Sequence, residues 1–383
     1  MILYDLQVEN TVNPLSVDFE RPRFSWKLSS EKNAVMQTEY RIQVARKSGG
    51  KPLIVWDSGL VACEDSLYIP YSGDSLVPCT QYSVRIEVRD NHNDTAWATT
   101  FFETGLLSEP WNAQWIAAQP FDVTETYSPC VLFRKEIELK QMPVRARLYA
   151  TALGLYSAHI NQAPAGDTFL NPGFTSYNKE HLYQAYDVTN MLHEGQNRLE
   201  FLLTEGWYNS AYTHVRIRDK YGKRNAVLFR MLMEFEDGTS QTVVSDGTIN
   251  WSFSPIQLSH IYDGEIYDAR LEPENQRNWS TVDIINHPAN CLRGQAHEPI
   301  RKVEERPAMS LFVTPKGERV LDLGQNMVGF VRLNLSAKEG DRVELHYFET
   351  LDSDGNAYFD NLKNARQELK LICRDGEIGR AHV

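Results

Sequence analysis

The sequence lacks the features that would tie it to nucleic acid or to a membrane. It has 51 acidic residues against 39 basic ones, a formal net charge of -12 at pH 7, and its lysines and arginines form no run. Because nucleic-acid backbones are bound by clustered positive charge, we expect no nucleic-acid partner. The apolar runs fall far short of the ~20 residues that cross a bilayer as a helix, so no membrane segment is predicted.

Cysteine is scarce as well. The sequence contains five cysteines, widely spaced and without a CxxC pair, at Cys63, Cys79, Cys130, Cys291 and Cys373. This pattern predicts neither a disulfide framework nor a zinc site. Residues 1–5 show neither the basic region nor the apolar core of a secretory signal, and we therefore expect a cytoplasmic protein.

Recognisable catalytic motifs are missing too. The sequence has no G-x-S-x-G, no H-E-x-x-H and no glycine-rich phosphate loop. Glycoside hydrolysis requires a pair of carboxyl groups, but 51 acidic residues scattered over strand patterns single out no pair. We therefore predict no catalytic residue, no cofactor and no metal ligand in this chain.

Short strand patterns are abundant, and so are aromatic residues, with 18 tyrosines and 8 tryptophans. In residues 1–107, turn signals recur about every ten residues, which is typical of an immunoglobulin-like or fibronectin III-like sandwich. We expect Trp26 in its core. The strand patterns lie at residues 23–28, 40–45, 52–57, 82–89 and 98–104. Residues 108–111 (SEPW) are interpreted as a linker that docks on the next domain.

Residues 115–299 alternate strand patterns with turn formers. We expect one strand at 146–160, a two-residue turn at Asn161 and Gln162, and one helical turn at 187–192 with Asp187 as its N-cap. Residues 225–236 and 242–251 are expected to pair around Asp237 and Gly238. From residue 300 onward a third domain begins, with a strand ending near Leu335 and a hairpin turn at 339–341 that leads into a strand at 343–348.

Several motifs in succession carry a family resemblance. They are ERPRFSWKL, TEYRIQVA, VWDSGLV and FFETG in the first region, DGEIYDAR in the second, and DLGQNMVGFVRL and ETLDSDGNAYFDNLKNA in the third. The chain resembles the N-terminal part of bacterial α-L-rhamnosidases (glycoside hydrolase family 78). This implies an all-β fold: a fibronectin III/immunoglobulin-like domain at 1–107, a jelly-roll β-sandwich at 115–299 and a partial concanavalin-like β-sandwich at 300–383.

The resemblance also implies a function. The intact parent would hydrolyse terminal non-reducing α-L-rhamnose from glycosides or polysaccharides, with inversion, using an acid and a base from a helical (α/α)6 barrel. This chain would supply accessory β-domains and be inactive alone; a homodimer of the parent is left open. The alternatives are a stand-alone rhamnose-binding module and a structural array of sandwiches, the latter requiring a signal peptide or an anchor.

The final residues carry a separate hypothesis. Residues 377–383 fit no family pattern and resemble a translated sequencing adapter, so we expect the gene to continue beyond Val383.

The chain departs from the family pattern at two places. Asn161 and Gln162 stand where the family usually has an Asn-Gly turn, and residues 367–371 fit the family pattern poorly. The DSDG segment from Asp352 begins like a calcium loop, but the required bidentate acid is missing, so we interpret it as a turn.

Sugar binding is the chemistry that remains open to this chain. A deoxyhexose presents an apolar face and vicinal hydroxyls, which an aromatic platform and polar side chains would bind. Our candidates are Trp207 and Tyr208 as the platform, with Asp167, Asn171 and Glu265 as polar groups. Alternatively, the first two polar residues form turns, the tryptophan is a core residue, and Glu265 joins Asp268 and Arg270 in a loop ion-pair network. No pair of residues in this chain can be aligned with a calcium-binding pair of the family, so no metal ligand is predicted.

Overall fold

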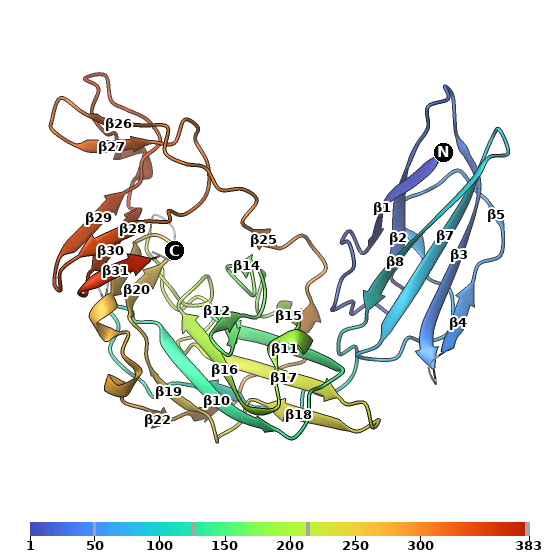
Figure 1. The fold of residues 1–383 in the computed structure, drawn as a ribbon, viewed down its shortest axis with the longest axis horizontal. Helices are drawn as coiled ribbons and strands as arrows, with labels where there is room; N and C mark the ends of the chain where they lie inside the picture. Colours follow the sequence, from blue (N-terminus) through green and yellow to red (C-terminus); the bar gives the residue numbers. More distant parts are fainter. Residues whose placement is uncertain (49–50, 125–126, 212–214, 380–383) are drawn as a thin grey trace.

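The computed structural model describes residues 1–48, 51–124, 127–211 and 215–379. Residues 380–383, on which the adapter hypothesis partly rests, and Tyr212 lie outside them. The described chain is built of strands, with short 3-10 turns between some of them (Figure 1). The prediction of an all-β chain is confirmed. Within these ranges no helix combines the length and the apolar character that a membrane crossing requires.

The first unit, residues 1–107, is a sandwich of two sheets, with strand orders β1-β2-β6 and β4-β3-β7-β8, and with β5 paired to β3. Trp26 lies between the sheets at 1% exposure, and its indole N–H donates to Gln37 Oε1 at 2.9 Å, so its predicted core position is confirmed. The strands are β1 (Ile2–Val8), β2 (Arg23–Ser29), β3 (Gln37–Ser48), β4 (Lys51–Asp57), β5 (Val61–Ala62), β6 (Ile69–Pro70), β7 (Gln81–Asp90) and β8 (Thr95–Glu103).

The central sandwich packs a six-stranded sheet, β13-β12-β16-β10-β19-β22, against a seven-stranded one. The second sheet has the order β23-β9-β17-β11-β15-β24, with β18 added to β17. Phe201 and Phe229 stack at 4.9 Å between ring centroids, joining the two sheets through the core. The six-stranded sheet contains β10 (Val131–Leu139), β12 (Leu155–Ile160), β13 (Ala163–Pro164), β16 (Gly195–Thr204), β19 (Asn250–Phe253) and β22 (Ser280–Thr281). The other contains β9 (Trp115–Ala117), β11 (Arg145–Leu153), β15 (His181–Asp187), β17 (Ala226–Glu234), β18 (Ser240–Val244), β23 (Asp283–Ile285) and β24 (Leu292–Gly294).

The single strand predicted at 146–160 is wrong: the structure divides it into β11 and β12, which belong to opposite sheets. The break lies at Gly154, whose φ of 133° is a backbone conformation that glycine adopts readily and other residues rarely adopt. A Cβ there would lie 2.4 Å from the Thr204 carbonyl oxygen. A run of buried, mostly apolar residues continues across the glycine, and this is why the sequence alone suggested one strand.

Two other local predictions need correction. The helical turn is a 3-10 turn, η1 (Thr189–Met191), whose N-cap is Val188, although Asp187 Oδ1 accepts the Thr189 N–H at 3.1 Å. The predicted pair around Asp237 is present as β17 and β18, but its second half is shorter than expected. The residues from Asn250 instead form β19, which pairs with β10 in the other sheet.

The terminal segment, residues 300–379, shares a sheet with the central region. That sheet has the order β20-β21-β30-β29, and β21 and β30 run parallel, with Glu265 opposite Leu369. A turn does occupy 339–341, but β28 pairs with β31 rather than with β29, so the predicted hairpin is wrong. The domain limits at 299 and 300 stay a prediction. The shared sheet contains β20 (Ile256–His260), β21 (Gly264–Asp268), β29 (Arg342–His346) and β30 (Glu368–Ile372). The remaining strands are β14 (Thr168–Phe169), β25 (Ile300–Arg301), β26 (Ser310–Val313), β27 (Arg319–Asp322), β28 (Asn334–Ala337) and β31 (Gly376–Gly379).

A buried ion-pair network connects the first unit to the central sandwich. Glu103, at the end of β8, is 0% exposed, and its carboxylate accepts from Arg147 Nη2 at 2.6 Å and Arg145 Nη2 at 2.9 Å. The linker also docks as predicted, because Trp111 packs edge-on against Tyr183 at 5.2 Å. These contacts fix the orientation of the two units relative to each other.

Candidate functional site

Two of the polar candidates lie on the loop around β14. The Asn171 side chain is buried at 5% exposure, and its Nδ2 donates to Thr168 Oγ1 at 2.8 Å. The Asp167 carboxylate is 75% exposed and accepts from Arg301 Nε at 3.0 Å. The amide therefore serves its own loop, as the turn interpretation expects, while the carboxylate faces solvent beside one guanidinium.

The aromatic candidates differ in how much surface they offer. Trp207 is half-buried and stacks on Phe174 at 5.6 Å with an interplanar angle of 26°, and Phe174 is 54% exposed. Tyr208 is only 4% exposed and packs edge-on against Tyr177 at 5.7 Å. The accessible aromatic surface here is therefore the Trp207–Phe174 stack, whereas Tyr208 supports it from below.

A small hollow lies beside this aromatic cluster. Its volume is about 380 Å³, and Tyr177, which contacts both Phe174 and Tyr208, contributes to its wall. Cys291 Sγ donates to the Tyr177 carbonyl oxygen at 3.7 Å and closes one side. The residues that line it are Tyr177, Asn178, Lys179, His287, Pro288, Asn290 and Cys291.

Glu265 lies apart from the other candidates, on β21. Its side chain is 4% exposed, and within the described ranges its Oε1 has no hydrogen-bond partner. Burial raises the pKa of Glu265 to about 8, so the carboxyl is mostly neutral at pH 7. It does not join the expected ion-pair network, in which Arg270 Nη2 contacts Asp268 Oδ2 at 2.8 Å.

The structure places the five candidates in three groups. Trp207 and Tyr208 pack in the ring cluster with Phe174 and Tyr177, whereas Asp167 and Asn171 lie on the loop around β14, a few residues before Phe174. Glu265 belongs to a different sheet. In the part of the chain that the structure describes, no group of three or more His, Cys, Asp or Glu side chains could hold a metal ion.

Sequence reasoning missed Phe174 as part of the aromatic surface. A signal was present, because Phe174 directly follows Pro172 and Gly173, a turn that tends to expose the next side chain. It also missed the network at Glu103. No local pattern could have revealed that network, because its partners lie in a different sheet of the next unit.

Comparison with known families gives three successive matches. Residues 3–108 match the Rha78A-like N-terminal immunoglobulin domain, residues 141–304 the alpha-L-rhamnosidase N-terminal domain, and residues 313–382 the bacterial alpha-L-rhamnosidase concanavalin-like domain. This chain belongs to the α-L-rhamnosidase family. The predicted resemblance to the N-terminal domains of these enzymes is therefore confirmed.

Individual α-L-rhamnosidases support the same assignment. One from Alteromonas sp. (strain LOR) is 30% identical over 393 residues, which is 96% of this chain and 42% of that protein. One from Formosa agariphila is 29% identical, over 95% of this chain and 43% of that protein. The chain therefore spans less than half the length of these relatives.

Solved structures of α-L-rhamnosidases have the same fold. The Aspergillus terreus enzyme superposes with a TM-score of 0.91 at 28% identity, covering 99% of this chain and 45% of that one. The Streptomyces avermitilis enzyme, solved in complex with L-rhamnose, gives 0.89 at 25% identity, covering 99% of this chain and 54% of that one. The whole architecture of this chain, and not one domain alone, is thus found in the family.

Proposed function

We propose that this chain provides the non-catalytic N-terminal β-domains of an α-L-rhamnosidase, and that the whole protein hydrolyses terminal α-L-rhamnosyl groups of glycosides or polysaccharides. One observation carries the proposal: 99% of the chain superposes on 45% of the Aspergillus terreus enzyme with a TM-score of 0.91. The domains would brace the remainder of the enzyme and shape its substrate entrance.

The inactivity of this chain by itself is part of the proposal. Glycosidases need two accessible carboxyl groups on either side of the scissile bond. Two buried carboxyl groups are unsuited to such a pair: Glu103 is held by two arginines, and Glu265 is enclosed in a sheet. We therefore assign no catalytic role to either residue.

We also propose a cytoplasmic location. All five cysteines are free thiols in the structure, and two of them, Cys130 and Cys373, are buried. Free thiols persist in a reducing compartment, whereas secreted proteins commonly pair them. The location can be checked by fractionating cells of the source organism and detecting the protein with an antibody.

A second candidate function is rhamnose binding by the chain itself, which the Trp207–Phe174 stack favours. An aromatic ring with one open face can pack against the apolar side of a deoxyhexose. Asn171 and Asp167 are the polar candidates nearest to this surface along the chain. In this proposal they would contribute hydrogen bonds to the sugar hydroxyls, and Glu265 would not take part.

A paired assay on the purified chain tests both functions. We expect no hydrolysis of a chromogenic α-L-rhamnoside, and turnover above background would refute the claim of inactivity. Calorimetric titration with L-rhamnose, with and without calcium, tests the binding function. If binding occurs, Trp207→Ala should abolish it while Trp97→Ala, a matched change at a tryptophan 59% exposed on the first unit, should leave it intact.

A further inference from the structure

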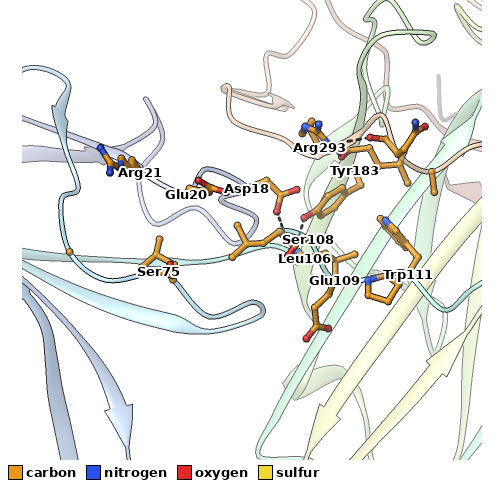
Figure 2. Close-up of a pocket in the computed structure, with 17 residues that line it drawn as sticks. Asp18, Glu20, Arg21, Ser75, Leu106, Ser108, Glu109, Trp111, Tyr183 and Arg293 are labelled. Carbon is orange, nitrogen blue, oxygen red and sulfur yellow. Dashed lines mark hydrogen bonds between the residues drawn. The ribbon is translucent and has the colours of Figure 1, made fainter.

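A cleft of about 930 Å³ lies at the junction of the first unit and the central sandwich (Figure 2). Its volume is within the ~300–1,000 Å³ range of small-molecule sites. One wall comes from the first unit and carries Glu20, Arg21 and Ser75, and the opposite wall carries Asn290 and Arg293. The floor is the linker between the units, residues 106–111, with Tyr183 behind it.

The walls are held in place by a single carboxylate at the base of the cleft. Asp18 accepts the Leu107 N–H at 2.9 Å and the Gly294 N–H at 2.8 Å, so it joins the first unit to the linker and to the central sandwich. The Tyr183 hydroxyl accepts the Leu106 N–H at 2.8 Å beside it. A ligand would therefore meet a preformed cleft and would not have to order its walls.

The lining of the cleft has two chemical characters. The floor is apolar, because Leu76, Leu106 and Trp111 pack there with only their edges accessible. The rim is polar and offers both donors and acceptors. In the described ranges, the side chains of Glu20 and Arg21 make no hydrogen bond or ion pair with the rest of the protein.

The charges of the cleft nearly cancel. Asp18, Glu20 and Glu109 contribute three carboxylates, and Arg21 and Arg293 contribute two guanidinium groups. Glu109 is already paired with Arg230, at 3.2 Å, so two carboxylates face two guanidinium groups. An acidic sugar or a phosphate would therefore meet carboxylates as well as the two arginines in this lining. A neutral sugar suits this lining better, because each hydroxyl can donate to a carboxylate and accept from a guanidinium.

We propose that this interdomain cleft binds a neutral oligosaccharide. The apolar floor would pack against the C–H faces of the sugar rings, and the rim of Arg21, Asn290 and Arg293 would hold the hydroxyls. The cleft adjoins the hollow beside the Trp207–Phe174 surface, because Asn290 lines both, but it does not depend on rhamnose recognition. It extends the proposed rhamnosidase function, since it would hold the glycan chain rather than its terminal rhamnose.

The test is isothermal titration of the full chain with neutral tetrasaccharides of β-glucan, xylan, arabinan, galactan and mannan, and with tetragalacturonate as the acidic probe. We expect at least one neutral probe to bind. Arg21→Ala and Asn290→Ala should each weaken that binding about tenfold or more, because each removes hydrogen bonds to the sugar. Ser75→Trp should block the cleft and abolish binding.

The control is Arg89→Ala, which removes a side chain 40% exposed on the other sheet of the first unit and should leave binding unchanged. The substituted rim side chains are exposed, so circular dichroism should show folded variants. The proposal is overturned if no neutral probe binds at about 10 mM, if only tetragalacturonate binds, or if the cleft variants bind like the unmodified chain. Failure of L-rhamnose to bind would count against the module function alone.

Discussion

Glu265 is a residue whose protonation is determined by the fold. Its carboxyl lies at 4% exposure between strands, and burial raises its pKa from 4.5 to about 8. The folded protein therefore holds a proton that the unfolded chain releases between about pH 4.5 and pH 8. In this window the free energy of unfolding falls as pH rises, by up to about 1.4 kcal/mol per pH unit.

Glu265→Gln should remove this pH dependence. The amide cannot ionise, so we expect the variant to unfold at a higher temperature than the unmodified chain at pH 8, and to lose that advantage toward pH 5. Differential scanning calorimetry at several pH values measures the effect. Glu194→Gln, at an exposed side chain beyond η1, is the control and should follow the unmodified chain throughout. Equal shifts of Glu265→Gln at pH 5 and pH 8 would contradict the prediction.

Single residues differed in how well the sequence predicted them. Trp26 could be placed in the core because apolar residues alternate in the next strand region, at Tyr40, Ile42 and Val44. The environment of Glu265 could not be predicted. The residue lies between β20 and β30, and β30 follows about a hundred residues later along the chain. A local pattern identifies the carboxyl but not the surroundings that neutralise it.

At the scale of the elements, the hairpin of β12 and β13 has backbone strain in its turn. Ile160 pairs with Ala163, which leaves Asn161 and Gln162 as a two-residue turn with φ of 51° and 71°. Both values lie in the left-handed region that this turn type requires. Asparagine tolerates that region, but glutamine does not favour it, so the turn departs from the Asn-Gly pattern at a cost.

Gln162→Gly should therefore stabilise the chain, by up to about 1 kcal/mol. The matched control is Gln196→Gly in β16, where the backbone is extended and the side chain exposed; there glycine should destabilise by about 0.5 to 1 kcal/mol. Urea unfolding followed by tryptophan fluorescence gives both values. Destabilisation by Gln162→Gly would show that the side chain makes a contact that outweighs the backbone strain.

Several strands of the first unit could be predicted from the sequence pattern, since β2, β4 and β7 begin and end within a residue or so of their expected positions, whereas β3 and β8 begin about three residues earlier than expected. The errors occurred where a strand crosses between sheets. Gly154 separates β11 from β12 without interrupting the apolar pattern, and Asp246 to Ile249 carry the chain from β18 to β19. Alternation reports which residues are buried, and it does not report in which sheet.

At the scale of the whole molecule, the first unit depends on Glu103 for its attachment. The carboxylate has 0% exposure, and Arg147, its partner, is 7% exposed. Removing one partner of a buried ion pair costs about 3 to 5 kcal/mol when the other charge is left without compensation. Here Arg147 would keep Asp187 at 2.7 Å and Arg145 would keep Glu234 at 2.6 Å, so we expect a cost toward the lower end of that range. The network therefore makes the orientation of the two units sensitive to one side chain.

Glu103→Ala should lower the unfolding temperature and loosen the junction, increasing the radius of gyration measured by small-angle X-ray scattering. As a control, Asp94→Ala breaks an exposed pair with Lys32 in the same unit and should change little, because exposed pairs contribute little to stability. An unchanged radius of gyration together with an unchanged unfolding temperature would show that the junction is held by other contacts.

The sequence could not predict how the units are arranged relative to each other. The motifs gave the order of the domains, and the linker was expected to dock, but the cleft depends on a contact between Asp18 and Gly294, which are 276 positions apart. Such a contact has no local signature. It arises because two sandwiches, each specified by its own apolar pattern, leave a polar space where their edges meet.

The parallel pairing of β21 with β30 delays the completion of their sheet while the chain is being synthesised. One edge of β21 can pair at once with β20, which precedes it along the chain, but the other must wait for Glu368 and its successors, about a hundred residues later. At 5–20 residues per second, that wait on the ribosome lasts roughly 5 to 20 s. During this interval a strand edge is open to other nascent chains. Slow codons between the two strands would lengthen this interval, and we expect them to lower the yield of folded protein.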